Sequence, residues 1–219
     1  MLEFREPGRS TRAMRLATSA LTIAGWTGRN PTSVQHHIDE LAAIGVAPPA
    51  QVPMLYRVAS SLLATGPVIE AVGDNSSGEA EFCLFKVNGQ LYVAVGSDHT
   101  DRALERHDIA LSKQVCAKPV SSNCWRFDDV ETHWDQLRLR SFATKDGAER
   151  LYQEGCVSEL LHPLELLAKI GTPFEDGHVV FGGTIPVIGD VSAADCFRVE
   201  LHDPVLDRML VCAYKIRII

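Results

Sequence analysis

Residues 79–98 read EAEFCLFKVNGQLYVAVGSD, two mainly apolar segments on either side of the dipeptide Asn88-Gly89. An Asn-Gly pair between apolar segments is the strongest short signal for a tight β-hairpin turn. The pattern therefore predicts two antiparallel strands, over residues 79–87 and 90–95. Further strands are predicted from the apolar runs at residues 19–25, 137–144, 179–181, 196–201 and 209–218.

Helices are predicted at fewer places. One should begin near Asn30-Pro31, where Asn, Thr and Ser side chains can cap it, and should continue to about Ile44 with Gly45 as its stop. Shorter helices are predicted over residues 100–107 and 163–170. Strands and hairpins outnumber helices and do not alternate with them, so we predict an α+β fold that is mostly β.

The composition is that of an ordinary globular chain of 219 residues, 46% of them hydrophobic and 22% charged. Its size favours a single domain, residues 1–219, around one core. The net charge of −7 argues against binding nucleic acid through a general basic surface. No glycine-rich phosphate loop follows a strand, and no apolar run has the length of a membrane span or the pattern of a secretory signal.

The six cysteines are scattered and form no CxxC pair, which argues against a zinc ribbon or a thioredoxin-like site. Several lie within apolar runs and are expected to be small buried side chains. We therefore predict a cytoplasmic protein that binds neither nucleic acid nor a membrane.

Three carboxylates are candidates for a metal site. Glu79 and Glu81 occupy positions i and i+2 of a strand and therefore point to the same face. Asp98 follows the partner strand, so the hairpin can bring all three together. Oxygen ligands of this kind suit a hard divalent cation such as Mg²⁺ or Mn²⁺. Alternatively, the two glutamates lie on a solvated face, Asp98 or Asp101 caps the following helix, and His99 is structural rather than a ligand.

A candidate general base lies on the first predicted helix. His37 and Glu40 are three residues apart and therefore neighbours on one helix face. A carboxylate beside an imidazole orients the ring for proton transfer, although surface His–Glu pairs have the same spacing. Further along the chain, Lys113 could stabilise a developing enolate, and the Gly183-Thr184 turn could present an N–H and a hydroxyl to a carboxylate.

The order of these elements resembles that of the fumarylacetoacetate hydrolase superfamily over roughly residues 19–219. The matching positions are His37/Glu40, the proline-rich segment 48–53, Glu79/Glu81, Asp98/Arg102, Lys113 and Gly183/Thr184. The chain departs from the family pattern in several ways. Ser112 replaces a common glycine before the lysine, and Ile185 separates Gly183-Thr184 from the proline. The segment between Asp98 and Lys113 is shorter than is often found in the family, and the Asn-Tyr that commonly precedes the histidine is absent. The chain thus resembles a divergent, bacterial branch.

The resemblance implies a mixed β-roll with a few flanking helices. Residues 1–70 would supply an N-terminal strand and a lid-like helix segment, and residues 71–219 the metal-binding core, with a homodimer as the usual assembly. It implies Mg²⁺ or Mn²⁺ on Glu79, Glu81 and Asp98. The substrate would be a small 2-oxo acid resembling an acylpyruvate, cleaved hydrolytically at a C–C bond.

The resemblance also implies roles for single residues. His37, held by Glu40, would deprotonate the attacking water, while Lys113 would stabilise the enolate. Gly183, Thr184 and Lys113 would bind the substrate, and Arg102 would orient a metal ligand. Three alternatives stay open: a metal-dependent decarboxylase, dehydratase or tautomerase acting on a similar acid, a non-catalytic small-acid-binding protein with the same fold, and a globular dimer whose acids are solvated.

Overall fold

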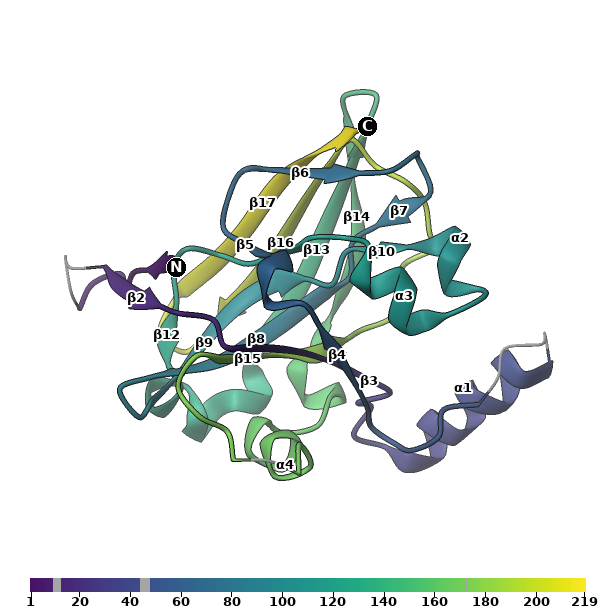
Figure 1. The fold of residues 1–219 in the computed structure, drawn as a ribbon. Coiled ribbons are helices and arrows are strands. Elements are labelled where there is room, and N and C mark those ends of the chain that lie inside the picture. Colours follow the sequence, from purple (N-terminus) through teal and green to yellow (C-terminus); the bar gives the residue numbers. More distant parts are fainter. Residues whose placement is uncertain (10–12, 44–47, 172) are drawn as a thin grey trace.

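The computed structural model describes residues 1–9, 13–43, 48–171 and 173–219; within the helix at residues 31–43 it does not describe the side chains of residues 37, 40, 41 and 43. Two β-sheets packed face to face form the body of the molecule, and short helices surround them (Figure 1). The chain is mostly β, as predicted.

The larger sheet contains the predicted hairpin. Its six strands lie in the order β12 (Trp125–Arg126), β9 (Gln90–Ser97), β8 (Ala80–Val87), β15 (His178–Thr184), β3 (Ala20–Gly25) and β4 (Met54–Val58). The strands β8 and β9 are antiparallel around Asn88 and Gly89, which both have positive φ, 51° and 75°. At the centre, β15 pairs antiparallel with β8 and parallel with β3.

The second sheet has five strands and is built mainly from the C-terminal half of the chain. Their order is β14 (Ala148–Cys156), β13 (Arg138–Lys145), β16 (Cys196–Asp203), β17 (Arg208–Ile218) and β6 (Val68–Ala71). The strands β13, β14, β16 and β17 pair antiparallel, whereas β6 pairs parallel with β17. The strands β14 and β6 were not predicted from the sequence.

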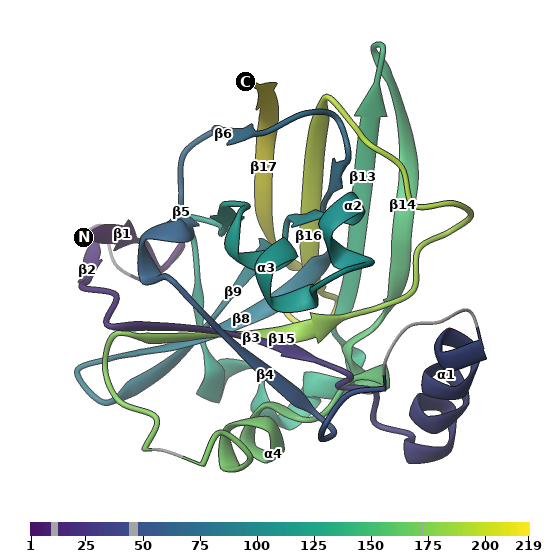
Figure 2. The same ribbon diagram turned by 45° about the vertical axis from the view of Figure 1, so that its right-hand side comes forward.

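Short elements complete the fold. Three two-stranded ladders join β1 (Leu2–Phe4) to β2 (Met14–Leu16), β7 (Ser76–Ser77) to β10 (Thr100–Asp101), and β5 (Leu63–Ala64) to β11 (Lys118–Pro119). The helices are α1 (Pro31–Ala43), α2 (Arg102–Glu105), α3 (Ile109–Gln114) and α4 (Pro163–Ala168), with 3₁₀ turns at Ser60–Leu62, Phe127–Asp129, Glu131–Gln136 and Val157–Glu159. In both views α2 and α3 lie on one side of β3, β4 and β15, α4 lies on the other side, and α1 stands at the periphery (Figure 2).

The strand β8 is buried on both faces, and this fixes where its acidic residues point. Phe82 and Leu84 face the core between the two sheets. Cys83 and Phe85 face a second core on the opposite side of the larger sheet. Because side chains alternate along a strand, Glu81 belongs to the second side, the side that carries α3.

The predicted helices are confirmed in part. Asn30 caps α1, since its Oδ1 accepts a hydrogen bond from the N–H of Thr32 at 3.0 Å. The predicted end of this helix at Ile44 and Gly45 falls outside the described residues. The helix expected over residues 100–107 is wrong in extent: β10 occupies its start, and only the single turn of α2 follows.

Two further observations bear on the predictions from composition. In the described part of the chain, none of the helices has the length and apolar character needed to cross a membrane. All six cysteines are free thiols, and the buried ones are Cys83, Cys116, Cys124 and Cys212.

Candidate metal centre

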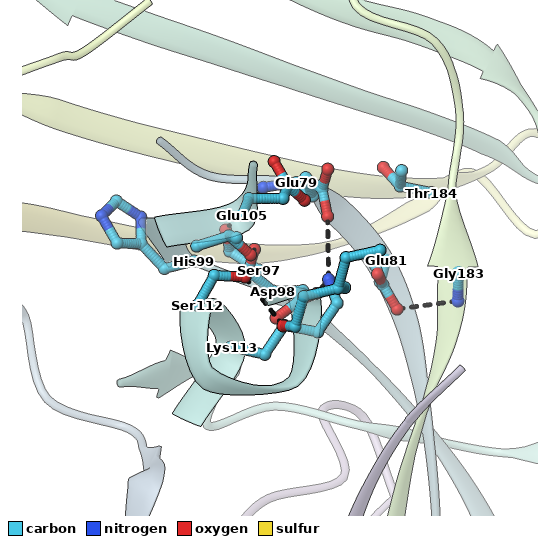
Figure 3. A network of polar contacts seen from close by, with 12 residues as sticks. Glu79, Glu81, Ser97, Asp98, His99, Glu105, Ser112, Lys113, Gly183 and Thr184 are labelled. Atoms are coloured by element: carbon cyan, nitrogen blue, oxygen red, sulfur yellow. Dashed lines mark hydrogen bonds and ion pairs between the residues drawn. The ribbon is translucent and has the colours of Figure 1, made fainter. Parts of the chain in front are cut away.

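The hairpin brings the three predicted carboxylates together. Glu79 immediately precedes β8, Glu81 lies within it, and Asp98 follows β9, where its N–H donates to the carbonyl of Glu79 at 2.9 Å. One carboxylate oxygen from each residue lies within 4.8 Å of the others (Figure 3). Glu81 is 2% exposed and Asp98 is fully buried, so the alternative of a solvated face does not hold for them.

Three cations surround these carboxylates. Lys113 of α3 contacts Oδ2 of Asp98, and its Nζ lies 3.6 Å from Oε2 of Glu79. Lys118 of β11 places its Nζ 3.1 Å from Oδ1 of Asp98. Arg102 of α2 places Nη1 3.0 Å from Oε1 of Glu79. We call these six residues the carboxylate cluster; with every group ionised, its three negative charges equal its three positive charges.

The charges within the cluster are unevenly matched. Burial would raise the pKa of Asp98, but Lys113 and Lys118 outweigh burial and lower it to about 2. Burial and the nearby Asp98 raise the pKa of Glu81 well above its usual range, against the hydrogen bond from Gly183. Among the described residues Glu81 has no ion-pair partner, unlike Glu79 and Asp98.

Lys113 and Arg102 remain cationic in this environment. Burial opposes the charge of Lys113, but Asp98 and Glu79 raise its pKa above the usual value. Burial likewise opposes the charge of Arg102, and Glu79 and Glu105 raise its pKa. Both side chains therefore carry a positive charge at neutral pH, and this charge is available to an anionic ligand.

Gly183 supports Glu81 through its backbone. Its N–H donates to Oε2 of Glu81 at 2.7 Å. Its φ is +93°, and a Cβ at this position would lie 1.8 Å from Oγ1 of Thr27, so only glycine fits. The hydroxyl of Thr184 donates to the carbonyl of Ala80 at 2.9 Å and accepts from Gln153. Both donors thus have partners within the protein. The substrate contacts expected of Gly183 and Thr184 stay predictions.

Arg102 pairs with an acid close to Asp98 rather than with Asp98 itself. Besides Glu79, it contacts Glu105 at 2.8 Å and donates to Oγ of Ser77 at 2.6 Å. The helix cap is Asp101, whose Oδ1 accepts from two backbone N–H groups of α2 at 2.9 Å. Asp98 is therefore free of the capping role that the sequence left open for it.

His99 is structural rather than a ligand. Its Nδ1 lies 3.0 Å from the hydroxyl of Tyr214, and its Nε2 lies 2.9 Å from Oγ of Ser76. Burial, with Lys118 and Arg102 nearby, lowers the pKa of His99 to about 3. The ring is therefore neutral at pH 7, and both of its nitrogens are engaged.

The predicted base cannot be placed with the cluster. His37 and Glu40 lie on α1, but their side chains are outside the described part of the structure. Their pairing and their role stay predictions. Sequence analysis also missed Lys118, which is 0% exposed. The signal was a lysine in the apolar run Cys116-Ala117-Lys118-Pro119-Val120, where a charge has to find a buried partner.

The donor set fits a divalent cation. All three groups offer carboxylate oxygens, which Mg²⁺ and Mn²⁺ prefer. Oδ1 of Asp98 is buried and accepts no hydrogen bond within the described residues, and Glu81 lacks a counter-charge. A cation bound among these oxygens would satisfy both groups.

A second polar cluster lies on the opposite face of the larger sheet. The hydroxyl of Thr22 lies 2.8 Å from Nε2 of His178, and Nη1 of Arg57 lies 3.3 Å from each of them. We call these three residues the histidine cluster. It borders a cavity of about 600 Å³ that Leu55 and Ile170 also line. Burial and Arg57 lower the pKa of His178 to about 4, so its ring is neutral.

Comparisons with known proteins agree with the fold. The family model described as a protein of unknown function (DUF2848) matches residues 24–214, and no curated protein sequence matches significantly. A protein from Yersinia pestis CO92 assigned to the fumarylacetoacetate hydrolase family has a TM-score of 0.66 at 16% identity, over 98% of this chain and 100% of that one. A yeast protein of that family has a TM-score of 0.65 at 18% identity, over 92% of this chain and 94% of that one.

A third structure is that of an enzyme with bound ligands. It is 2-keto-3-deoxy-D-arabinonate dehydratase complexed with magnesium and 2,5-dioxopentanoate, with a TM-score of 0.62 at 18% identity, over 91% of this chain and 74% of that one. At this level of identity the three structures establish the fold. The predicted mixed β-roll of the fumarylacetoacetate hydrolase type is thereby confirmed.

Proposed function

We propose an enzymatic role for this chain, which belongs to the family of proteins of unknown function DUF2848. The proposed enzyme binds Mg²⁺ or Mn²⁺ through Glu79, Glu81 and Asp98 and acts on a small 2-oxo acid. The reaction that we favour is hydrolytic cleavage of a C–C bond. The magnesium and 2,5-dioxopentanoate bound to the dehydratase with the same fold support the choice of metal and substrate class.

One observation carries the proposal: Glu81 is 2% exposed and has no cationic partner among the described residues. A buried carboxylate without a counter-charge is costly, and proteins pair such groups or use them to bind metals. Lys113, Lys118 and Arg102 are all directed to Asp98 or Glu79. A divalent cation would supply the charge that Glu81 lacks.

The residues of the chain divide the work between binding and chemistry. When bound, the metal would supply Lewis-acid polarisation of the 2-oxo acid. Lys113 is 7% exposed in its side chain, and its ammonium group is the cation placed to attract the substrate carboxylate and the developing enolate. His37, oriented by Glu40, would accept the proton of the attacking water. Arg102 would hold the carboxylate of Glu79 in position through their ion pair.

Two measurements on the purified chain test this function. The first is the thermal unfolding midpoint with and without Mn²⁺, and the second is turnover of a panel of small 2-oxo acids. Metal-dependent stabilisation together with metal-dependent turnover supports the enzyme. Stabilisation without turnover favours the small-acid-binding protein. The absence of both stabilisation and turnover would contradict the metal site itself.

A variant of the predicted base separates hydrolysis from the lyase alternatives. His37→Gln should keep Mn²⁺ binding and lose hydrolysis by roughly 10²- to 10⁴-fold, the usual contribution of a general base. Glu40→Gln should lose less, because it only orients the ring. The adjacent His36→Gln is the matched control, since it points about 100° away on the same helix. Retained turnover in His37→Gln would favour decarboxylation, dehydration or tautomerisation, in which no water is activated.

A further inference from the structure

Lys118 is buried beside Asp98, where its side chain contacts the backbone that links β9 to β10. Its side chain is 0% exposed, and its Nζ donates to the carbonyl of His99 at 2.5 Å while lying 3.1 Å from Oδ1 of Asp98. The segment that carries it packs tightly, because a Cβ on Gly96 would lie 2.6 Å from the carbonyl oxygen of Pro119. The ammonium group is thus fixed by backbone contacts on its own side of the cluster.

Lys113 and Lys118 contact different carboxylate oxygens of Asp98, and they differ in exposure. Lys113 contacts Oδ2, comes from a short helix, and faces the ring of Tyr56 at 5.8 Å. Lys118 contacts Oδ1 and has no exposed surface. The side chain of Lys113 is 7% exposed, whereas that of Lys118 has no exposed surface, so Lys118 can act on a ligand only through Asp98 and through its charge.

The charge count gives Lys118 a definite effect. With every group ionised, the three carboxylates and the three cations of the cluster cancel, and Glu105, which contacts Arg102 at 2.8 Å, adds one negative charge. A divalent cation would bring this total to +1. A metal bound to Asp98 would lie within a few ångströms of the ammonium group of Lys118, and like charges at this range in a buried site repel strongly. An anion that joins the metal removes this repulsion.

We propose that Lys118 is a positioning residue that couples metal binding to anion binding: it holds Asp98 in place, weakens the binding of the metal alone, and strengthens the binding of the metal together with an anionic ligand. This inference rests on the proposed function and extends it. The fixed positive charge favours doubly charged ligands, the class to which 2-oxo dicarboxylates belong. The metal would then be held firmly only when such a ligand is present.

Calorimetric titration with Mn²⁺, in the absence and presence of oxalate, tests the coupling in the wild type. Oxalate is a planar dianion that can chelate the metal, and pyruvate is the singly charged comparison. After correction for Mn²⁺–oxalate association in solution, we expect oxalate to tighten Mn²⁺ binding about tenfold more than pyruvate does. If oxalate and pyruvate tightened Mn²⁺ binding to the wild type equally, that result alone would overturn the inference. Absence of Mn²⁺ binding would instead contradict the proposed function.

Lys118→Met keeps the length of the side chain and removes its charge. We expect its metal-free form to unfold at a lower temperature, because Asp98 loses one of its two cations, and yet to bind Mn²⁺ alone about tenfold more tightly. The gain from oxalate should fall by a similar factor. A purely structural role predicts the lower stability without the tighter binding. Lys215→Met, which removes an exposed lysine on β17, is the matched control and should change neither quantity.

A second variant keeps the test decisive if Lys118→Met does not fold. Lys118→Gln retains a donor for the carbonyl of His99 and lacks the charge, so it should show the same tighter Mn²⁺ binding. Unchanged or weaker Mn²⁺ binding in either folded variant would overturn the inference. If neither variant folds, the wild-type comparison of oxalate with pyruvate decides it.

Discussion

The carboxylate cluster and the histidine cluster lie on opposite faces of the same sheet, near opposite ends of β15. Gly183, at one end, holds Glu81, and His178, at the other, bonds to Thr22. Most side chains of both clusters are buried, although Arg57 of the histidine cluster is exposed. In the histidine cluster Thr22, Arg57 and His178 bond to one another, whereas in the described part of the chain the carboxylate cluster contains an acceptor without a hydrogen bond and a glutamate without a cationic partner.

The difference shows that burial of polar groups does not by itself mark a functional site. In the histidine cluster the buried Thr22 and the neutral ring of His178 have hydrogen-bond partners, and the charged Arg57 is exposed, so the cluster is stable without a ligand. A cluster that leaves buried charge unmatched is stabilised by a ligand of the opposite charge. Variants of one cluster therefore serve as controls for variants of the other.

Acid should destabilise the protein through His99, the histidine behind the carboxylate cluster. Its pKa is about 3 in the folded protein, against the usual 6.5 of a histidine, so between these values the unfolded chain binds a proton that the folded chain does not. Stability from this group is therefore complete above pH 6.5 and is lost as the pH falls to about 3, by about 5 kcal/mol in all. The free-energy difference between wild type and His99→Gln, measured by urea unfolding, should shrink over this range; a constant difference would contradict it.

Glu81→Gln should remove metal binding and leave the fold intact. The amide can still accept from the N–H of Gly183, but it carries no charge for the cation. We expect Mn²⁺ affinity to fall at least about 100-fold, beyond the range for partners of ligands. The metal-free protein should be at least as stable as wild type, since an unmatched buried charge is gone. Calorimetry and thermal unfolding measure the two effects, and undiminished Mn²⁺ binding would remove Glu81 from the site.

Arg102→Lys should weaken metal binding more modestly. Lysine keeps the charge but cannot contact Ser77, Glu79 and Glu105 at once, as the guanidinium does. We expect about a tenfold loss of Mn²⁺ affinity, typical of groups that orient a ligand. If turnover of a 2-oxo acid fell a thousandfold with unchanged Mn²⁺ affinity, Arg102 would touch the substrate instead.

Thr22→Val in the histidine cluster should have the smallest effect. It removes the hydroxyl that lies 2.8 Å from Nε2 of His178, at a cost of about 1 kcal/mol in the free energy of unfolding. Mn²⁺ affinity should equal that of wild type, because the cluster lies on the other face of the sheet. A change in metal affinity would show that the two clusters are coupled through β15.

Local signals in the sequence were sufficient for the metal-ligand candidates. Asn88-Gly89 defines the hairpin, and pairing along the hairpin brings Glu79, Glu81 and Asp98 together without help from the rest of the chain. The order of the motifs then led to the fold family. Each of the seven predicted strands lies within a few residues of its observed ends, because alternation and turn residues are local properties.

The features that escaped prediction depend on distant parts of the chain. Whether Lys118 is exposed or buried is decided by β11 packing beside β5 and β9, which its own neighbours in sequence do not specify. The strand β14 carries many exposed residues and a register shift opposite Ser141 and Phe142, so its alternation is weak. The short helix α3 depends on Asp108, whose side chain caps it.

The parallel pairing of β3 with β15 also bears on how the chain is made. The pairing joins Ala20 to His178, and β15 supplies the N–H that holds Glu81. During synthesis at about 5–20 residues per second, the hairpin of β8 and β9 is complete several seconds before β15 exists. For that time β8 is an open strand edge, the kind of surface on which nascent chains aggregate. The repelling carboxylates of Glu79, Glu81 and Asp98 stand at one end of this edge, so the groups proposed to bind the metal in the finished protein discourage wrong pairing in the unfinished one.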